Sequence, residues 1–135
     1  MTRINAGIPP KELSDKHLLA EHREIKRIPN MIAAKGCNCL DEIPEHFVLG
    51  KGHVKFFYNK IAFLHMRYLE IYSECLSRLF KVENYQQGFL TVLQKYPQLY
   101  NDYEPTLMGI GLIKERILQK SKCKTWEEYQ SKKSG

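Results

Sequence analysis

The first residues of the chain hold a group that could do chemistry. The sequence begins Met1-Thr2-Arg3, so removal of the initiator Met would leave Thr2 with a free α-amine. An α-amine has a pKa of about 7.7–8.0, so a sizeable share of it is unprotonated at neutral pH, whereas a lysine amine, at about 10.4, would need a large shift. Whether this amine is used depends on the groups that the rest of the chain brings to it.

Three titratable residues share one face of the first predicted helix. His17, Glu21 and Glu24 are spaced at i, i+4 and i+7, which places them on the same side of an α-helix. Arg23 and Arg27, four residues apart, lie together on its flank. Taken alone, this pattern is typical of a solvated face with ion pairs between successive turns. Apolar residues occupy the remaining arc, so the polar face meets either water or a ligand.

Helical signals dominate the elements that must position these residues. Ser14 or Asp15 is the predicted N-cap of the first helix, and Pro29 is predicted to end or kink that helix near Arg27 or Ile28. Further helices are predicted over 30–35 with a stop at Gly36, over about 53–80, within 84–96, from Pro105 to about 120, and for a short turn around Trp126. Because no alternating strand pattern occurs, we predict an all-α fold with three main helices and long loops.

Length and composition fit one compact domain over residues 1–135, because 43% of the residues are hydrophobic, enough to bury a core. The formal net charge of +6 favours an anionic partner such as nucleic acid. The longest apolar runs are far too short for a membrane span, and the first residues lack a secretory-signal pattern. The four cysteines show no disulfide-framework spacing, so we expect a cytoplasmic protein.

The pair Cys37 and Cys39 could be half of a metal site. A tetrahedral zinc site usually takes a Cys-x-x-Cys pair and two further paired ligands, and nothing later in the sequence supplies them. We therefore predict two ordinary loop thiols and no bound metal.

Several stretches in the same order resemble the pyrimidine-dimer DNA glycosylase family. They are "MTRIN", "HLLAEHRE", "FVLGKGHVKFFYNKIAFL", "ECLSRLF" and the late "TW". The resemblance runs from Thr2 to about Tyr129 and is densest over residues 2–5, 17–27 and 47–80. It implies a DNA repair enzyme that removes a damaged base and then nicks the backbone at the abasic site.

The resemblance also implies which groups do the chemistry. The nucleophile of the family is the α-amine matched by Thr2, which forms an imine with the sugar. The catalytic carboxylate is matched by Glu24, which can take protons and stabilise the cationic sugar. Neither step needs a metal or an organic cofactor.

The DNA contacts of the family map onto basic residues of this chain. Arg3, Arg23 and Arg27 match its DNA-binding arginines, and His17 matches a histidine near the active site. Lys16 stands where the family often has Gln, and both side chains can reach a phosphate. The expected partner is double-stranded damaged DNA, most of all DNA with pyrimidine dimers. We expect the protein to act as a monomer and not to bind a membrane.

Other features of the sequence leave alternatives open. The C-terminal "TWEEYQ" retains Trp126 and Tyr129 but puts two acids between them, where phage members of the family have an aromatic-rich segment, so another lesion preference is an alternative. The "GKGH" segment at 50–53 is predicted to be a loop that caps the following helix, although Lys51 and His53 could touch a phosphate. Glu21 is expected in an ion pair near Arg23. The lysines 120, 122 and 124 are either a solvated terminus or a backbone-binding patch. A non-catalytic helical DNA-binding module and a helical protein-interaction domain are the competing classes.

Overall fold

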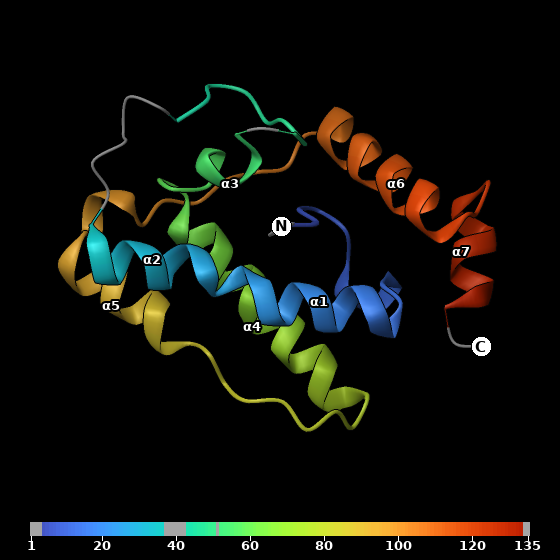
Figure 1. Cartoon of the computed structure of the whole chain (residues 1–135), viewed down its shortest axis with the longest axis horizontal. Coiled ribbons are helices and arrows are strands. Elements are labelled where there is room, and N and C mark those ends of the chain that lie inside the picture. The colour runs from blue at the N-terminus through green and yellow to red at the C-terminus, as the bar shows by residue number, and fades with distance from the viewer. Residues whose placement is uncertain (1–3, 37–42, 51, 134–135) are drawn as a thin grey trace.

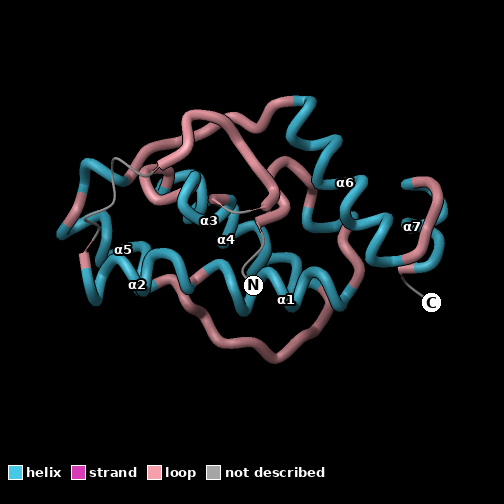
Figure 2. Tube along the Cα trace, turned by 45° about the horizontal axis from the view of Figure 1, so that its top comes forward, coloured by secondary structure: helices cyan, strands magenta, loops and turns pink. Residues whose placement is uncertain are grey.

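The structure is a computed structural model that describes residues 4–36, 43–50 and 52–133. Within these ranges the chain is all-helical, as predicted, and has no β-strand. The α-helices are α1 (Asp15–Ile25), α2 (Arg27–Lys35), α3 (His53–Phe56), α4 (Ile61–Ser77), α5 (Gln87–Lys95), α6 (Leu107–Ser121) and α7 (Trp126–Lys132), with short 3-10 helices η1 (Pro10–Glu12) and η3 (Pro97–Leu99). The predicted count of three main helices is not confirmed, because the described residues form seven α-helices. Long loops separate several of these helices (Figure 2).

The helices stack around α4 at the centre of a single domain (Figure 1). Helix α1 packs across α4, and α2 packs against α5. Helices α6 and α7 stand together at the opposite end of the molecule from α5. The core between α1 and α4 is formed by side chains with no solvent exposure, such as Leu18, Ile25, Leu64 and Ile71. No helix of the described residues is both long enough and apolar enough to cross a membrane.

Local signals set the ends of α1 and α2. Ser14 caps α1, as predicted, because its hydroxyl accepts the backbone N–H of His17. The predicted break before Pro29 is present, one residue earlier than expected, at Lys26. Pro29 lies in the first turn of α2, where the missing N–H costs no helical hydrogen bond. Gly36 ends α2, as predicted, with a positive φ of 73° that suits glycine.

The helix predicted over 53–80 is two helices, α3 and α4. A turn over residues 57–60 separates them, and Lys60 donates from Nζ to the carbonyl of Phe56 at 2.9 Å, near the end of α3. Both Phe56 and Phe57 are buried at this turn, which a continuous helix would direct about 100° apart. Helix α4 ends where Leu79 adopts a left-handed φ of 65°, a position usually taken by glycine.

Capping residues also begin the two C-terminal helices. Helix α6 starts at Leu107 rather than at Pro105, because Thr106 is the N-cap and accepts the N–H of Gly109 at 3.0 Å. For α7 the predicted cap is confirmed, since the hydroxyl of Thr125 accepts the N–H of Glu128 at 3.1 Å.

Candidate active site

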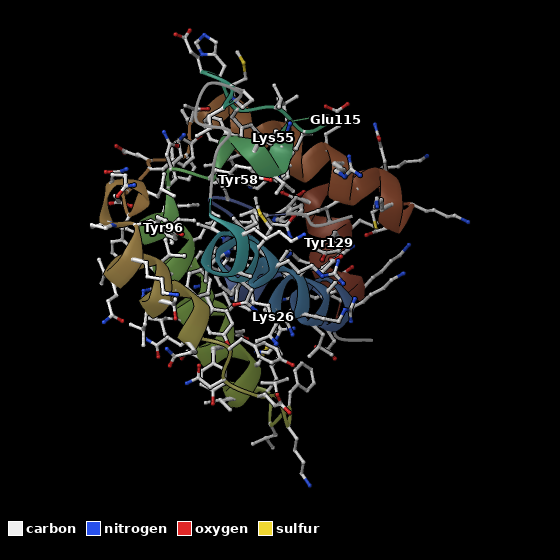
Figure 3. The ribbon with its side chains drawn as sticks, turned by 60° about the vertical axis from the view of Figure 1, so that its left-hand side comes forward. Lys26, Lys55, Tyr58, Tyr96, Glu115 and Tyr129 are labelled. Carbon is white, nitrogen blue, oxygen red and sulfur yellow. The ribbon has the colours of Figure 1, made fainter. Side chains whose placement is uncertain are left out.

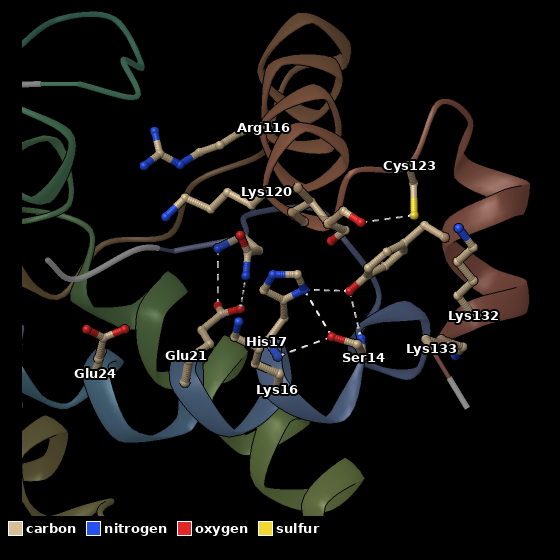
Figure 4. Close-up of a pocket in the computed structure, with 15 residues that line it drawn as sticks. Ser14, Lys16, His17, Glu21, Glu24, Arg116, Lys120, Cys123, Lys132 and Lys133 are labelled. Atoms are coloured by element: carbon tan, nitrogen blue, oxygen red, sulfur yellow. Dashed lines mark hydrogen bonds between the residues drawn. The ribbon is translucent and has the colours of Figure 1, made fainter. Parts of the chain in front are cut away.

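A cavity of about 400 Å³ lies between α1 and the two C-terminal helices. The N-terminal segment reaches it through Asn5, and α1 lines it with residues that include Glu21 and Glu24. Helix α6 contributes Arg116 and Lys120, which reach over the cavity from the opposite side (Figure 4). The cavity therefore joins carboxylates and cations from three segments that are far apart in the sequence.

The structure brings together part of the predicted site. Lys16, His17 and Glu24 line the cavity. Arg23 and Arg27 are exposed on the same helical path but are not among the described residues that line it. The two other predicted residues, Thr2 and Arg3, lie outside the described residues.

Glu24 combines partial burial with a cationic surrounding. Its side chain is 15% exposed, and Arg27 donates to its carboxylate from 3.4 Å. Such a long contact, with an arginine side chain that is 55% exposed, is by itself a weak ion pair. Across the cavity, Arg116 and Lys120 supply positive charge. A carboxylate in this position can accept protons and can stabilise a cation that forms in the cavity.

Arg116 and Lys120 are the functional candidates that sequence reasoning missed or left undecided. No motif in the sequence points to Arg116, and Lys120 is one of the three lysines that the sequence leaves as either a solvated terminus or a backbone-binding patch. The signal that could have found them is their spacing, because residues four apart share a helix face. The packing of α6, which spacing does not predict, is what places this helix face across the cavity from Glu24.

Glu21 has a structural partner, but it is Arg67 and not the surroundings of Arg23. The guanidinium of Arg67 donates to both carboxylate oxygens of Glu21, from Nε at 2.9 Å and from Nη2 at 3.0 Å. The two side chains are 5% and 1% exposed, so this is a buried ion pair. Asn5 donates to the same carboxylate from its side chain at 2.8 Å and from its backbone at 3.3 Å.

His17 belongs to a network that joins α1 to α7. Tyr129 is on α7 and faces α1 (Figure 3). Its hydroxyl accepts the backbone N–H of Ser14 at 2.8 Å and lies 2.7 Å from Nδ1 of His17 (Figure 4). The hydroxyl of Ser14 lies 3.0 Å from the same nitrogen. Each of the two hydroxyls already accepts a backbone N–H, so either can donate its own proton to Nδ1 of His17. This assignment puts the ring proton on Nε2.

The charge state of His17 agrees with that assignment. Burial lowers the pKa of His17, and the positive charges of Lys16 and Lys120 lower it further, against a smaller opposite effect of Glu21. The imidazole is therefore neutral at neutral pH and can donate one hydrogen bond from Nε2.

His53 is not available to a phosphate, which excludes that alternative for this residue. The side chain is buried, and its Nε2 accepts the backbone N–H of Ile4 at 3.0 Å. Its Nδ1 therefore carries the proton and donates to the carbonyl of Val48 at 2.8 Å. Lys51, its predicted companion, lies outside the described residues.

The C-terminal aromatic residues are engaged within the protein. The indole N–H of Trp126 donates to the carboxylate of Glu12 at 2.7 Å, and Tyr129 is only 3% exposed. Glu128 accepts from Lys132 at 2.9 Å and from the backbone of Lys124 at 3.0 Å. Trp126 and Tyr129 thus hold α7 against η1 and α1, whereas these contacts of Glu128 stay within α7 and the segment just before it.

The described residues contain no group of three His, Cys, Asp or Glu side chains that could hold a metal ion. Cys37 and Cys39, which the sequence offers as possible half of a metal site, lie outside the described residues.

Comparison with known families adds one match. Residues 1–86 match the model of the family described as pyrimidine dimer DNA glycosylase. The matched part spans nearly two thirds of the 135 residues and includes Asn5 and all of α1 with Glu24. Helices α6 and α7, which supply the other side of the cavity, follow the matched part.

Proposed function

This chain belongs to the pyrimidine dimer DNA glycosylase family, and from that premise we propose that it is a bifunctional N-glycosylase and abasic-site lyase with Thr2 as nucleophile. One observation carries the proposal: Asn5, close to the N-terminus, and Glu24 line the same cation-rimmed cavity. A residue spans at most about 3.6 Å, so an amine at residue 2 starts within roughly 11 Å of the Asn5 nitrogen.

In the proposed first step the unprotonated Thr2 amine attacks C1′ of the damaged nucleotide. A C–N bond forms to the protein while the glycosidic bond breaks, and the base leaves with the electron pair and takes a proton from water. The attacking nitrogen passes a proton to Glu24, which gives it to the ring oxygen as the C1′–O4′ bond breaks, so that the sugar ring opens to a protonated imine. Glu24 also stabilises the positive charge that builds on the sugar.

In the proposed second step the imine acidifies the neighbouring carbon. A proton leaves C2′, the C2′–C3′ double bond forms, and the C3′–O bond breaks, so that the 3′ phosphate leaves with the electron pair. Water then hydrolyses the imine and returns the free amine. The atoms balance without a metal or cofactor.

The cations around the cavity would hold the DNA backbone. Lys16, Arg116 and Lys120 line the cavity, and Arg23 and Arg27 are exposed beside it. Guanidinium and ammonium groups at these positions suit phosphates, and Arg3 is proposed to join them. The neutral His17 would donate from Nε2 to a phosphate or to the opened sugar. A monomeric state and a cytoplasmic location stay predictions.

Salt dependence measures these phosphate contacts. Replacing Lys120 or Arg27 by Ala is expected to lower the slope of log K against log salt concentration by about 0.9 for each lost contact. Both damaged and undamaged duplexes should bind more weakly, because phosphates carry no lesion information. The measurement is a binding titration on fluorescent duplexes at several salt concentrations.

Lys95→Ala is the matched control for the salt titration. Lys95 is exposed at the end of α5, remote from the cavity, and its loss changes the net charge by the same amount (Figure 1). Its slope should equal that of the unmodified protein. Equal changes in all three variants would show a general charge effect and would remove Lys120 and Arg27 from the DNA interface.

Borohydride trapping tests the proposed function itself. Borohydride reduces the imine to a stable amine, so the protein should become covalently attached to a duplex with one pyrimidine dimer or one abasic site, and not to an intact duplex. Running the dimer, a ring-opened purine and the abasic site in parallel would identify the lesion preference. A protein that binds these duplexes but is never trapped or never nicks them is a DNA-binding module instead.

A further inference from the structure

We propose that three buried side chains, His53, Glu21 and Arg67, form a clamp that positions the N-terminal amine for attack. The clamp holds residues 4–8, called here the N-terminal arm. The inference rests on the proposed function, because it assigns these residues to the reaction of the Thr2 amine. They are positioning residues, since they act on the arm and not on the DNA.

His53 makes the first attachment. Its Nε2 accepts the N–H of Ile4 at 3.0 Å, and its Nδ1 is bound to the carbonyl of Val48 at 2.8 Å. The ring is buried, at 2% exposure. Because both ring nitrogens are used, the acceptor that faces Ile4 keeps one fixed direction.

The ion pair makes the next two attachments. Glu21 accepts the backbone N–H of Asn5 at 3.3 Å and its side-chain amide at 2.8 Å. Arg67 holds both oxygens of that carboxylate and donates a further N–H to the carbonyl of Ile8. The arm is therefore bound at Ile4, Asn5 and Ile8 by side chains from α1, α3 and α4.

The packing of the N-terminal arm is consistent with a clamp that fixes the register of the arm against the core. Ile4, Ala6 and Ile8 are buried, at 1%, 2% and 0% exposure, so alternate side chains enter the core. At Gly7, with φ +85°, an added Cβ would lie 2.5 Å from Ile110 of α6. Apolar packing fixes which side of the arm faces inward, and the hydrogen bonds fix its register.

A buried ion pair is a costly way to obtain stability alone. Removing two charges from water costs several kcal/mol for each ion, and apolar replacements of similar size are often as stable or more stable. What the Glu21–Arg67 pair supplies is direction, because each of its hydrogen bonds requires one geometry. An amine two residues before Ile4 starts within about 7 Å of the Ile4 nitrogen, so a clamp at Ile4 limits where it can attack.

Two substitutions at His53 separate positioning from stability. In His53→Gln the amide oxygen can reach the place of Nε2 and accept from Ile4. In His53→Asn the shorter amide takes the place of Nδ1 and leaves Ile4 without its acceptor. Both variants lose the ring and one hydrogen bond, so their melting temperatures should fall by similar amounts.

The readout is the rate of borohydride trapping on abasic-site DNA at saturating DNA, together with the Kd for that DNA. We expect His53→Asn to trap ten- to a hundredfold more slowly than the unmodified protein, as a misplacement of about 1 Å can cause. His53→Gln should stay within about threefold, a margin of roughly 0.65 kcal/mol in activation free energy, and the Kd should change little in either. Equal trapping rates for the two variants would overturn the inference.

Glu21→Asp provides a second test if His53→Asn does not fold. The shorter side chain keeps a negative charge beside Arg67 but withdraws the carboxylate from Asn5. Its trapping rate should also fall at least tenfold with the Kd preserved, and a rate equal to that of the unmodified protein would count against the clamp. Absence of trapping in the unmodified protein would instead reject the proposed function, which distinguishes the two failures.

Discussion

Acetylation of the N-terminal amine is expected to abolish both borohydride trapping and strand cleavage. An imine forms only from an amine with a free electron pair and two exchangeable protons, whereas the electron pair of an amide nitrogen is delocalised into the carbonyl and only one N–H remains. Retention of Met1 should have nearly the same effect, because it moves the amine by one residue, about 3.6 Å, from the place set by Ile4. Mass spectrometry of the N-terminus, paired with the trapping assay on each form, makes the measurement.

Thr2→Ala is the matched control for the amine. It alters the side chain but leaves an α-amine at the same position, and a small residue 2 still permits removal of Met1. Much of the activity should remain. The mechanism fails if protein shown to be fully acetylated still cleaves abasic-site DNA at the unmodified rate.

Replacing Glu24 by Gln is expected to lower base excision by about three orders of magnitude. The substitution keeps the shape of the side chain but removes the group that takes the proton and balances the sugar cation. DNA binding should survive or tighten, because a negative charge leaves a cavity that Arg116 and Lys120 also line. Single-turnover excision on dimer-containing duplexes gives the rate.

Glu70→Gln serves as the control for Glu24→Gln. Glu70 is exposed on α4 and is not among the described residues that line the cavity, and its neutralisation changes the net charge equally. Excision by this variant should match the unmodified protein. Near-normal excision by Glu24→Gln would show that another group supplies the carboxylate function.

The sequence by itself determined the local features of the fold. Ser14 and Thr125 as helix caps, Gly36 as a helix stop and the shared face of His17 and Glu24 all follow from residues within a turn or two of one another. Caps depend on one side chain and a nearby N–H, and helical periodicity depends only on spacing. Such features do not need the rest of the chain, so they could be predicted.

The break between α3 and α4 could not be predicted from local sequence patterns. The spacing of the apolar residues over 53–80 is compatible with one continuous helix. The chain nevertheless turns at 57–60, and both Phe56 and Phe57 are buried in the core. Periodicity reports which residues prefer burial but not which surfaces are present to bury them.

The tertiary structure alone decided the partners in the site. Arg67 falls on the apolar face of α4, three residues after Leu64, and this position indicates burial without indicating that Glu21, 46 residues away, would neutralise it. His53 likewise meets Ile4 across 49 residues, and Arg116 reaches the cavity of Glu24 only because α6 packs there. These contacts depend on how helices pack against one another, which the spacing of residues within any one helix does not specify.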